Sequence, residues 1–318
     1  MQLLELDKVK KMKVSTSLFY DRSVDQMVKG QTELADTQTK LSSGKNVVNP
    51  SDAPDKATAI QRLKSVISRH DSYEKNLQAS SNRLIAEETA LESANDVLTR
   101  IKELAIQAAN GTLGPRDKEL VAVEIKGLSD DLIALANTQD VNENYIFSGS
   151  RVQVKPYERD PLGNISYKGD ETRNQVQVGD QRFIRFNRTG TDVFGRVVRE
   201  KSDGTVEGKG FFQALNQLAE GIKESNTEAI TRGLNDLDQA SFNIAVATAK
   251  VGTEMSVVET QRAVNEETVL QLKTTLSKVE DLDYSAAVIE MQKNMLALQS
   301  TQNSFSKISS LSLFNYIR

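Results

Sequence analysis

One stretch of the chain limits its possible folds more than any other, because residues 55–110 contain neither glycine nor proline. Within this stretch a mainly apolar stripe recurs every seven residues, at Leu63, His70, Leu77, Leu84, Leu91, Leu98 and Ala105. A seven-residue repeat is typical of a helix that packs lengthwise against other helices. The pattern predicts one helix of more than 50 residues, or about 80 Å at a rise of 1.5 Å per residue. A helix of that length cannot bury itself in an ordinary globule, so it must lie along other long helices.

The ends of this helix are also marked in the sequence. Asn49-Pro50 breaks the preceding structure, and Asn110-Gly111 supplies residues that readily adopt a left-handed backbone. Ser51 or Asp52 is expected to cap the start, with Asp55 in the first turn.

Both ends of the chain carry stripes with alternating spacings of three and four residues. The first stripe is Tyr20, Val24, Met27, Gln31, Leu34, Gln38 and Leu41; the second is Tyr284, Val288, Met291, Met295, Leu298, Gln302 and Phe305, with Ile308 beyond. This spacing is typical of a coiled coil, and the glutamines within it weaken an isolated pair of helices. We therefore expect terminal helices that pair with each other, or with neighbouring molecules, only on assembly. An ordinary antiparallel bundle with docked termini fits the periodicity equally well.

The middle of the chain has a different composition. Residues 149–210 hold nine of the 17 glycines, and residues 145–212 hold nine of the 17 aromatic residues. Glycine marks turns and aromatic residues favour strands, so a small β insert is expected at residues 150–210. Short strands are predicted at 151–154, 165–167, 175–178 and 182–186, with Gly179-Asp180 turning between the last two.

Helical patterns fill the rest, at residues 117–139, 211–224 and 227–279, with a joint at Asp281-Leu282-Asp283. The predicted fold class is therefore mainly α: a long-helix bundle with N- and C-terminal coiled-coil arms and a small β-rich insert. The expected domains are a terminal pair (12–44 with 277–318), a helical middle (45–149 with 211–276) and the insert (150–210).

The composition argues against most kinds of chemistry. The chain carries a net charge of −4, a single histidine and no cysteine. An acidic balance disfavours nucleic acid, and no apolar run approaches the length of a membrane span or of a secretory signal. His70 occupies a heptad position and has no second histidine or cysteine with which to share a metal. We expect no enzymatic activity, no metal, no cofactor and no membrane insertion.

Several motifs resemble one known group. Residues 41–54 read LSSGKNVVNPSDAP, and residues 142–150 read NENYIFSGS. SYKGD at 166–170, QVQVG at 175–179 and the C-terminal residues 283–317 follow in the same order. Together these motifs resemble the flagellin superfamily, and within it the proteins of the hook–filament junction. Residues 1–11 have no counterpart in that pattern; they are expected to be an extension, with Met12 or Met1 as the start.

The resemblance implies a structural subunit of the bacterial flagellum, exported unfolded through the flagellar type III channel and assembled helically at the hook–filament junction. It implies hook-associated protein 1 and flagellin as neighbours, further copies of the chain, and an export chaperone bound to the C-terminal arm. The expected assembly interface comprises Tyr20, Val24, Met27, Leu34, Leu41, Val288, Met291, Met295, Leu298, Phe305 and Ile308.

Three alternatives remain open at this point, and the first belongs to the same class of protein. A filament flagellin would share most of these motifs. An intracellular coiled-coil scaffold would share only the heptads, and its termini would already be folded in solution. An adhesin or binding module built on the insert has less support.

Overall fold

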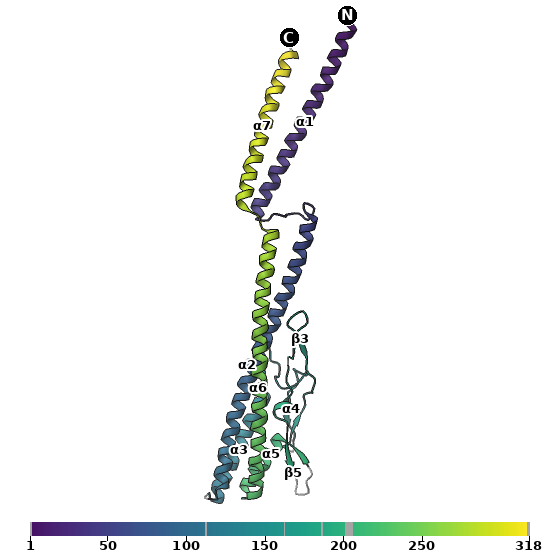
Figure 1. Cartoon of the computed structure of the whole chain (residues 1–318). Helices are drawn as coiled ribbons and strands as arrows, with labels where there is room; N and C mark the ends of the chain where they lie inside the picture. The colour runs from purple at the N-terminus through teal and green to yellow at the C-terminus, as the bar shows by residue number, and fades with distance from the viewer. Residues whose placement is uncertain (1, 112, 162, 186, 201–205, 317–318) are drawn as a thin grey trace. The chain divides into compact units, whose positions relative to one another are not determined.

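A computed structural model describes residues 2–111, 113–161, 163–185, 187–200 and 206–316 (Figure 1). The helices are α1 (Gln2–Ser43), α2 (Pro54–Ala109), α3 (Pro115–Ala136), α4 (Gly190–Val193), α5 (Phe211–Lys223), α6 (Thr227–Glu280) and α7 (Tyr284–Tyr316). The strands are β1 (Tyr157–Arg159), β2 (Ile165–Tyr167), β3 (Gln175–Gln177), β4 (Phe183–Arg185), β5 (Arg196–Glu200) and β6 (Val206–Gly210). The expected class, long helices with a small insert of short strands, is confirmed.

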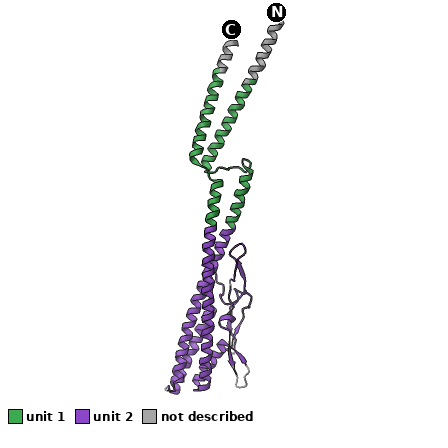
Figure 2. Cartoon of the chain, in the orientation of Figure 1, with its two compact units in different colours: residues 1–68, 269–318 green, residues 69–268 purple. Residues whose placement is uncertain are grey.

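The chain forms two compact units (Figure 2). Unit 1 comprises residues 1–68 and 269–318, and unit 2 comprises residues 69–268. Helices α2 and α6 contribute residues to both units. The three-part domain division expected from the sequence stays a prediction.

The heptad stripe of α2 forms the centre of the core of unit 2. Leu77, Leu91, Leu98 and Ala105 are fully buried, as the seven-residue repeat predicts. Contacts across the helices show that α6 runs antiparallel to α2, since Nδ1 of His70 lies 2.7 Å from Oδ1 of Asn265 and Lys102 pairs with Asp238. His70 is thus a half-buried residue of the helix pair, as expected, with its ring edge-on to Tyr73.

The start of α2 differs from the expected cap. The helix begins at Pro54, and the backbone N–H of Ala57 donates to the carbonyl of Ala53. Asp52 instead accepts the backbone N–H of Asn49 at 3.3 Å, within the preceding loop. Proline is favoured at the first helical position because its missing N–H would have had no partner there.

Helices α3 and α5 complete the bundle of unit 2. Helix α3 contacts α2 through an ion pair of Arg100 with Glu124, and contacts α5 through Lys223 and Glu119. At the crossing of α5 and α6, a Cβ atom on Gly233 would lie only 2.6 Å from Cδ1 of Leu218. A glycine at this position therefore lets the two helices approach closely.

The insert consists of three antiparallel ribbons of two strands each among the described residues. The register pairs Tyr157 with Tyr167, Val176 with Ile184, and Val198 with Gly208. Two of the predicted strands, around 165–167 and 175–178, are confirmed, and the strand at 182–186 is confirmed at Phe183–Arg185.

The predicted strand at 151–154 is wrong, and β1, β5 and β6 were not predicted. The backbone N–H of Val154 donates to the carbonyl of Arg151 at 2.8 Å, which closes a turn in place of an extended strand. The alternation of Val152 and Val154 therefore came from a turn followed by Pro156, not from a half-buried sheet.

Charged side chains fasten the insert to the long helices of unit 2. Arg188 is 4% exposed and pairs with buried Glu87 of α2 and with Glu254 of α6. Burial raises the pKa of the Glu87 carboxyl, and the adjacent Arg188 guanidinium opposes that rise. Arg83 of α2, also buried, donates to the carbonyl of Ile146 at 2.8 Å. Buried charged groups need such partners, because leaving them unpaired away from water is costly.

Candidate assembly interface on the terminal helices

Helices α1 and α7 pair in antiparallel fashion to form what we call the arm, within unit 1. The rings of Tyr20 and Phe305 meet edge to face with centroids 5.5 Å apart. Further along, a Cβ atom on Gly30 would lie 3.5 Å from Cδ1 of Leu298. The numbering of these partners rises along α1 and falls along α7, which defines the antiparallel order.

The seam between the two helices alternates large and small side chains. On α1 the half-buried or buried positions are Tyr20, Ser23, Met27, Gly30, Leu34, Thr37 and Leu41. On α7 they are Ala287, Met291, Asn294, Leu298, Thr301 and Phe305. The large apolar residues recur every seven positions, and small or polar residues lie between them. The small residues allow the helices to approach closely, as in other tightly packed helix pairs.

This seam corrects one expectation from the sequence. Gln31, Gln38 and Gln302 are exposed, so the glutamines do not lie between the two helices of a single chain. Gly30 and Thr37 on α1 and Thr301 on α7, each one position earlier, take those places, and Ser23 takes the place expected for Val24. A search for apolar stripes overlooks such residues because a seam can be built on small side chains as well as on large ones.

The residues expected at the assembly interface divide into two groups. Those turned toward the seam are Tyr20, Met27, Leu34, Leu41, Met291, Leu298 and Phe305. Those that remain exposed are Val24 (45%), Val288 (38%) and Met295 (49%). The side chain of Ile308 lies outside the described residues.

The arm exposes further large apolar side chains. The sequence interpretation missed Leu18 and Val28 on α1, and Ile289 and Leu296 on α7, which are each 67% exposed. Tyr284, which the sequence placed in the C-terminal stripe, is exposed as well. We define the exposed apolar face of the arm as these residues together with Val24, Val288 and Met295. Ile289 and Leu296 lie seven residues apart, so a second heptad stripe on α7 could have revealed them. Large apolar side chains exposed together on one helix pair indicate a site of association.

The base of the arm is fastened by backbone and side-chain contacts within unit 1. Gly44 adopts a φ of +69°, its carbonyl accepts the N–H of Leu282 at 3.0 Å, and the N–H of Asn46 donates to the carbonyl of Glu280 at 2.8 Å. We call this set of contacts the clasp. A Cβ on Gly44 would lie 2.7 Å from the hydroxyl at the end of the exposed Tyr284 side chain, which can move aside, so the positive φ is what favours glycine there.

Glu280 is the centre of the clasp. One carboxylate oxygen lies 2.8 Å from Nζ of both Lys45 and Lys64, and the side chain is 10% exposed. Hydrogen bonds from Lys45 and Lys64 lower the pKa of the Glu280 carboxyl below its ordinary value. The same contact with Glu280 raises the pKa of the Lys45 ammonium.

The described residues offer no candidate metal site. They contain no group of three or more histidine, cysteine, aspartate or glutamate side chains arranged to hold a metal. Within the same described ranges, no helix combines the length and apolar character needed to cross a membrane. The geometry presents a pair of long terminal helices with exposed apolar surface in unit 1. It also presents a helix bundle with a β insert in unit 2.

That architecture defines a class of flagellin-like structural proteins, and comparison with known proteins agrees. The family described as "Bacterial flagellin N-terminal helical region" matches residues 14–152. The flagellar hook-associated protein 3 of Salmonella typhimurium is 25% identical over 320 residues, covering 96% of this chain and 100% of the relative. The protein of the same name from Escherichia coli is 26% identical, covering 95% of this chain and 99% of the relative.

A solved structure shows the same fold. The flagellar hook-associated protein-3 of Legionella pneumophila superimposes with a TM-score of 0.62 at 21% identity, covering 69% of this chain and 98% of that chain. Over nearly its whole length the chain is thus similar to flagellar hook-associated protein 3, and its N-terminal part matches the flagellin family model. The expected resemblance to structural proteins of the bacterial flagellum, and not to enzymes, is confirmed. A flagellar junction protein of Legionella pneumophila, at 19% identity and a TM-score of 0.58, has the same fold.

Proposed function

We propose that the chain is an adaptor subunit that assembles through its arm, together with further copies of itself, between hook-associated protein 1 and flagellin. The observation that carries the proposal is the exposed apolar face of the arm. An isolated helix pair in water would be expected to turn such side chains inward. Ile289 and Leu296, each 67% exposed, instead face outward.

The energetics support association. Burying one large apolar side chain fully is worth about 1.5–3 kcal/mol, so covering several of these partly exposed residues yields enough free energy to hold neighbouring subunits. The seam within one chain is built partly on serine, glycine and threonine, which bury little apolar area. Neighbouring copies would therefore add much of the stability of the arm.

The interface residues follow from this arrangement. We assign to the assembly interface the residues expected from the sequence, Tyr20, Val24, Met27, Leu34, Leu41, Val288, Met291, Met295, Leu298, Phe305 and Ile308. To these we add Val28, Ile289 and Leu296. Copies that meet through unlike surfaces form an open helical array, which suits a layer within a tubular appendage.

The domain roles extend the same proposal. Residues 12–44 with 277–318 would form the tube contacts, residues 45–149 with 211–276 the middle domain, and the insert at 150–210 the outward part. Export is proposed to proceed unfolded through the flagellar type III channel, which the absence of cysteine permits. A chaperone would cover the apolar surface of α7 before export.

A strain that lacks this chain tests the proposal. We expect hooks without filaments by electron microscopy, with soluble flagellin in the medium, because flagellin would be exported with nothing to grow from. Hooks without filaments and without any flagellin product would identify the chain as the filament subunit instead. Unchanged flagella would contradict an assembly role.

A matched pair of variants then tests the exposed apolar face. Ile289→Asp with Leu296→Asp should leave the strain without attached filaments, while the purified variant keeps the circular dichroism of the parent chain. Ala297→Asp is the control, because Ala297 is also exposed on α7 but lies about a quarter-turn around the helix from Ile289 and Leu296 by the 3.6-residue repeat. Normal filaments with the double variant would show that this face is not an interface.

A further inference from the structure

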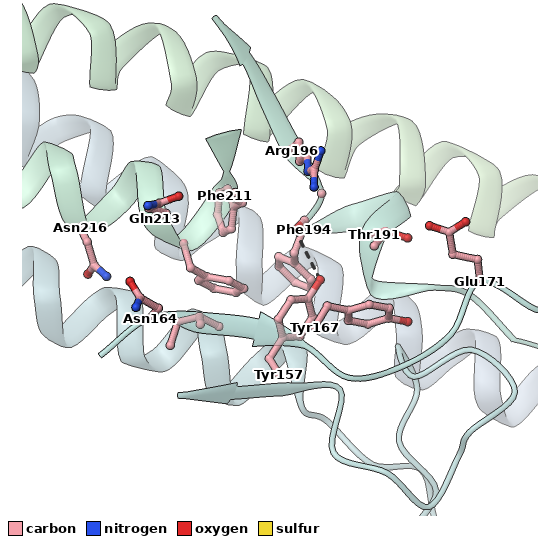
Figure 3. Close-up of a pocket in the computed structure, with 14 residues that line it drawn as sticks. Tyr157, Asn164, Tyr167, Glu171, Thr191, Phe194, Arg196, Phe211, Gln213 and Asn216 are labelled. Atoms are coloured by element: carbon pink, nitrogen blue, oxygen red, sulfur yellow. Dashed lines mark hydrogen bonds between the residues drawn. The ribbon is translucent and has the colours of Figure 1, made fainter. Parts of the chain in front are cut away.

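Unit 2 contains a cavity of about 790 Å³ that the assembly role does not explain (Figure 3). Its walls come from β1 and β2, from the segment that runs from α4 into β5, and from the first turns of α5. A volume in this range accommodates a small organic ligand or part of a longer one.

The floor of the cavity is an aromatic cluster. Tyr157, Phe194, Phe211 and Phe212 are each 4% exposed. The rings of Tyr157 and Phe212 lie 5.1 Å apart between centroids, and those of Phe211 and Phe212 lie 4.9 Å apart. Such close mutual packing fixes the floor before any ligand arrives. Tyr167, beside this cluster, is only half-buried and adds a more open aromatic wall.

Carboxamide side chains gather at one end. Figure 3 shows Asn164 and Asn216 at that end with Gln213 near them, while Glu171 lies at the other end. Gln213 and Asn216 form no side-chain hydrogen bond with the described residues, and Asn164 uses only its Nδ2, which donates to Asp160. Each of these amides therefore keeps hydrogen-bonding capacity for a ligand, and an amide both donates and accepts.

The charges around the cavity cancel. Arg196 and Glu171 are the two charged residues of its lining. A second cavity of about 470 Å³ adjoins the first and shares Asn164, Gln213 and Asn216. Its own charged lining residues are two basic and two acidic, namely Lys126, Arg159, Asp130 and Glu220. The combined cleft therefore has no net charge to attract an anion or a cation.

We propose that this cleft binds a neutral oligosaccharide. Free carboxamides can pair simultaneously with the donor and acceptor of neighbouring sugar hydroxyls, and the half-buried ring of Tyr167 can pack against the apolar C–H face of a sugar ring. The continuation of the first cavity into the second suits a ligand of several linked units. The cancelling charges disfavour phosphate-bearing ligands, including nucleic acids.

The test is isothermal titration calorimetry of the full chain with neutral hexasaccharides of glucose and of N-acetylglucosamine, in α- and β-linked forms. We expect at least one of them to bind, and Gln213→Ala with Asn216→Ala to weaken that binding by about tenfold or more. The control is Gln107→Ala on α2, an exposed glutamine outside the cleft, which should bind as the parent chain does. Asn164→Ala provides a second, independent cleft variant.

Three results would overturn the proposal. One is the absence of binding to every hexasaccharide. Another is binding that both cleft variants retain in full while circular dichroism shows that they are folded. The third is that an extended peptide binds, that the cleft substitutions abolish its binding, and that no saccharide binds. The cleft would then be a peptide site.

Discussion

Glu280 joins segments of unit 1 that are far apart in the sequence, because Lys45 and Lys64 reach the same carboxylate oxygen. Its carboxyl has a lowered pKa in the folded chain. A group of this kind adds stability above its unfolded pKa, about 4.3 for glutamate, and the added stability disappears as the pH falls through the folded value. Arg188 has the corresponding role in unit 2, where it faces two carboxylates from different helices.

We predict that Glu280→Gln lowers the unfolding free energy at pH 7 by about 1 kcal/mol, because both lysine partners are roughly half exposed and solvent screens the pairs. The difference from the parent chain should shrink as the pH falls through the folded pKa of Glu280. Urea unfolding at several pH values, followed by circular dichroism, measures both effects. Glu290→Gln on exposed α7 surface is the control and should change little. A pH-independent difference would mean that the charge of Glu280 is not what stabilises the clasp.

A second prediction concerns the buried pair of Arg188 and Glu87. Arg188→Ala should lower the unfolding free energy by about 3–5 kcal/mol, because it leaves Glu87 buried and lacking its closest cation. Adding Glu87→Leu to Arg188→Ala should recover part of that loss. A double-mutant cycle measured by urea unfolding tests this, and strictly additive losses would contradict the coupling.

At the scale of elements, helix contacts depend on where glycine stands. Gly127 of α3 has no atom within 4 Å of where a Cβ would be, whereas a Cβ on Gly233 of α6 would overlap Leu218 of α5. Both positions are interior to helices, where glycine costs about 1 kcal/mol relative to alanine. The surroundings of each glycine therefore decide whether its replacement by alanine raises or lowers the unfolding free energy.

We predict that Gly127→Ala raises the unfolding free energy by about 0.5–1 kcal/mol, through reduced freedom of the unfolded chain. Gly233→Ala should lower it by about 1–3 kcal/mol, since Leu218 must move. Thermal and urea unfolding of the two variants side by side measure the difference. Equal effects at both sites would show that α5 and α6 can move apart at Gly233 without a cost in unfolding free energy.

The helices were predictable because their signals are local. Heptad spacing, Asn110-Gly111 and Asp281-Leu282-Asp283 marked ends that agree with α2 and α6 to within a few residues. The seam of the arm was not predictable from the sequence. Ser23, Gly30 and Thr37 carry no apolar signal, and their positions in the seam depend on the partner helix. The ribbon of β5 and β6 was missed for a similar reason: Val198 is held by the side chain of Gln239 on α6, a contact 41 residues away in sequence.

At the scale of the whole molecule, residues 69–268 form a unit with a core of its own. Its helices bury the heptad stripe, and its insert is fastened by ion pairs that lie within the same range. The arm, in contrast, exposes several large apolar side chains. Under the proposed function, the two units divide stability and association between them.

This division predicts that a fragment of residues 69–268 folds alone. Its circular dichroism should be strongly helical and its urea transition cooperative, because its core contacts remain. The same fragment should fail to restore filaments in the deletion strain, whereas the full chain restores them. A fragment that aggregates or unfolds without cooperativity would show that the core of unit 2 needs residues from unit 1.

The clasp also has a mechanical consequence. Tension along α1 arrives at Gly44, whose carbonyl is bonded to Leu282, next to a second bond from Asn46 to Glu280. A pull on one terminal helix is therefore passed to both chain connections, because the two hydrogen bonds join them. In the rotating appendage of the proposed function, the two connections would share each load.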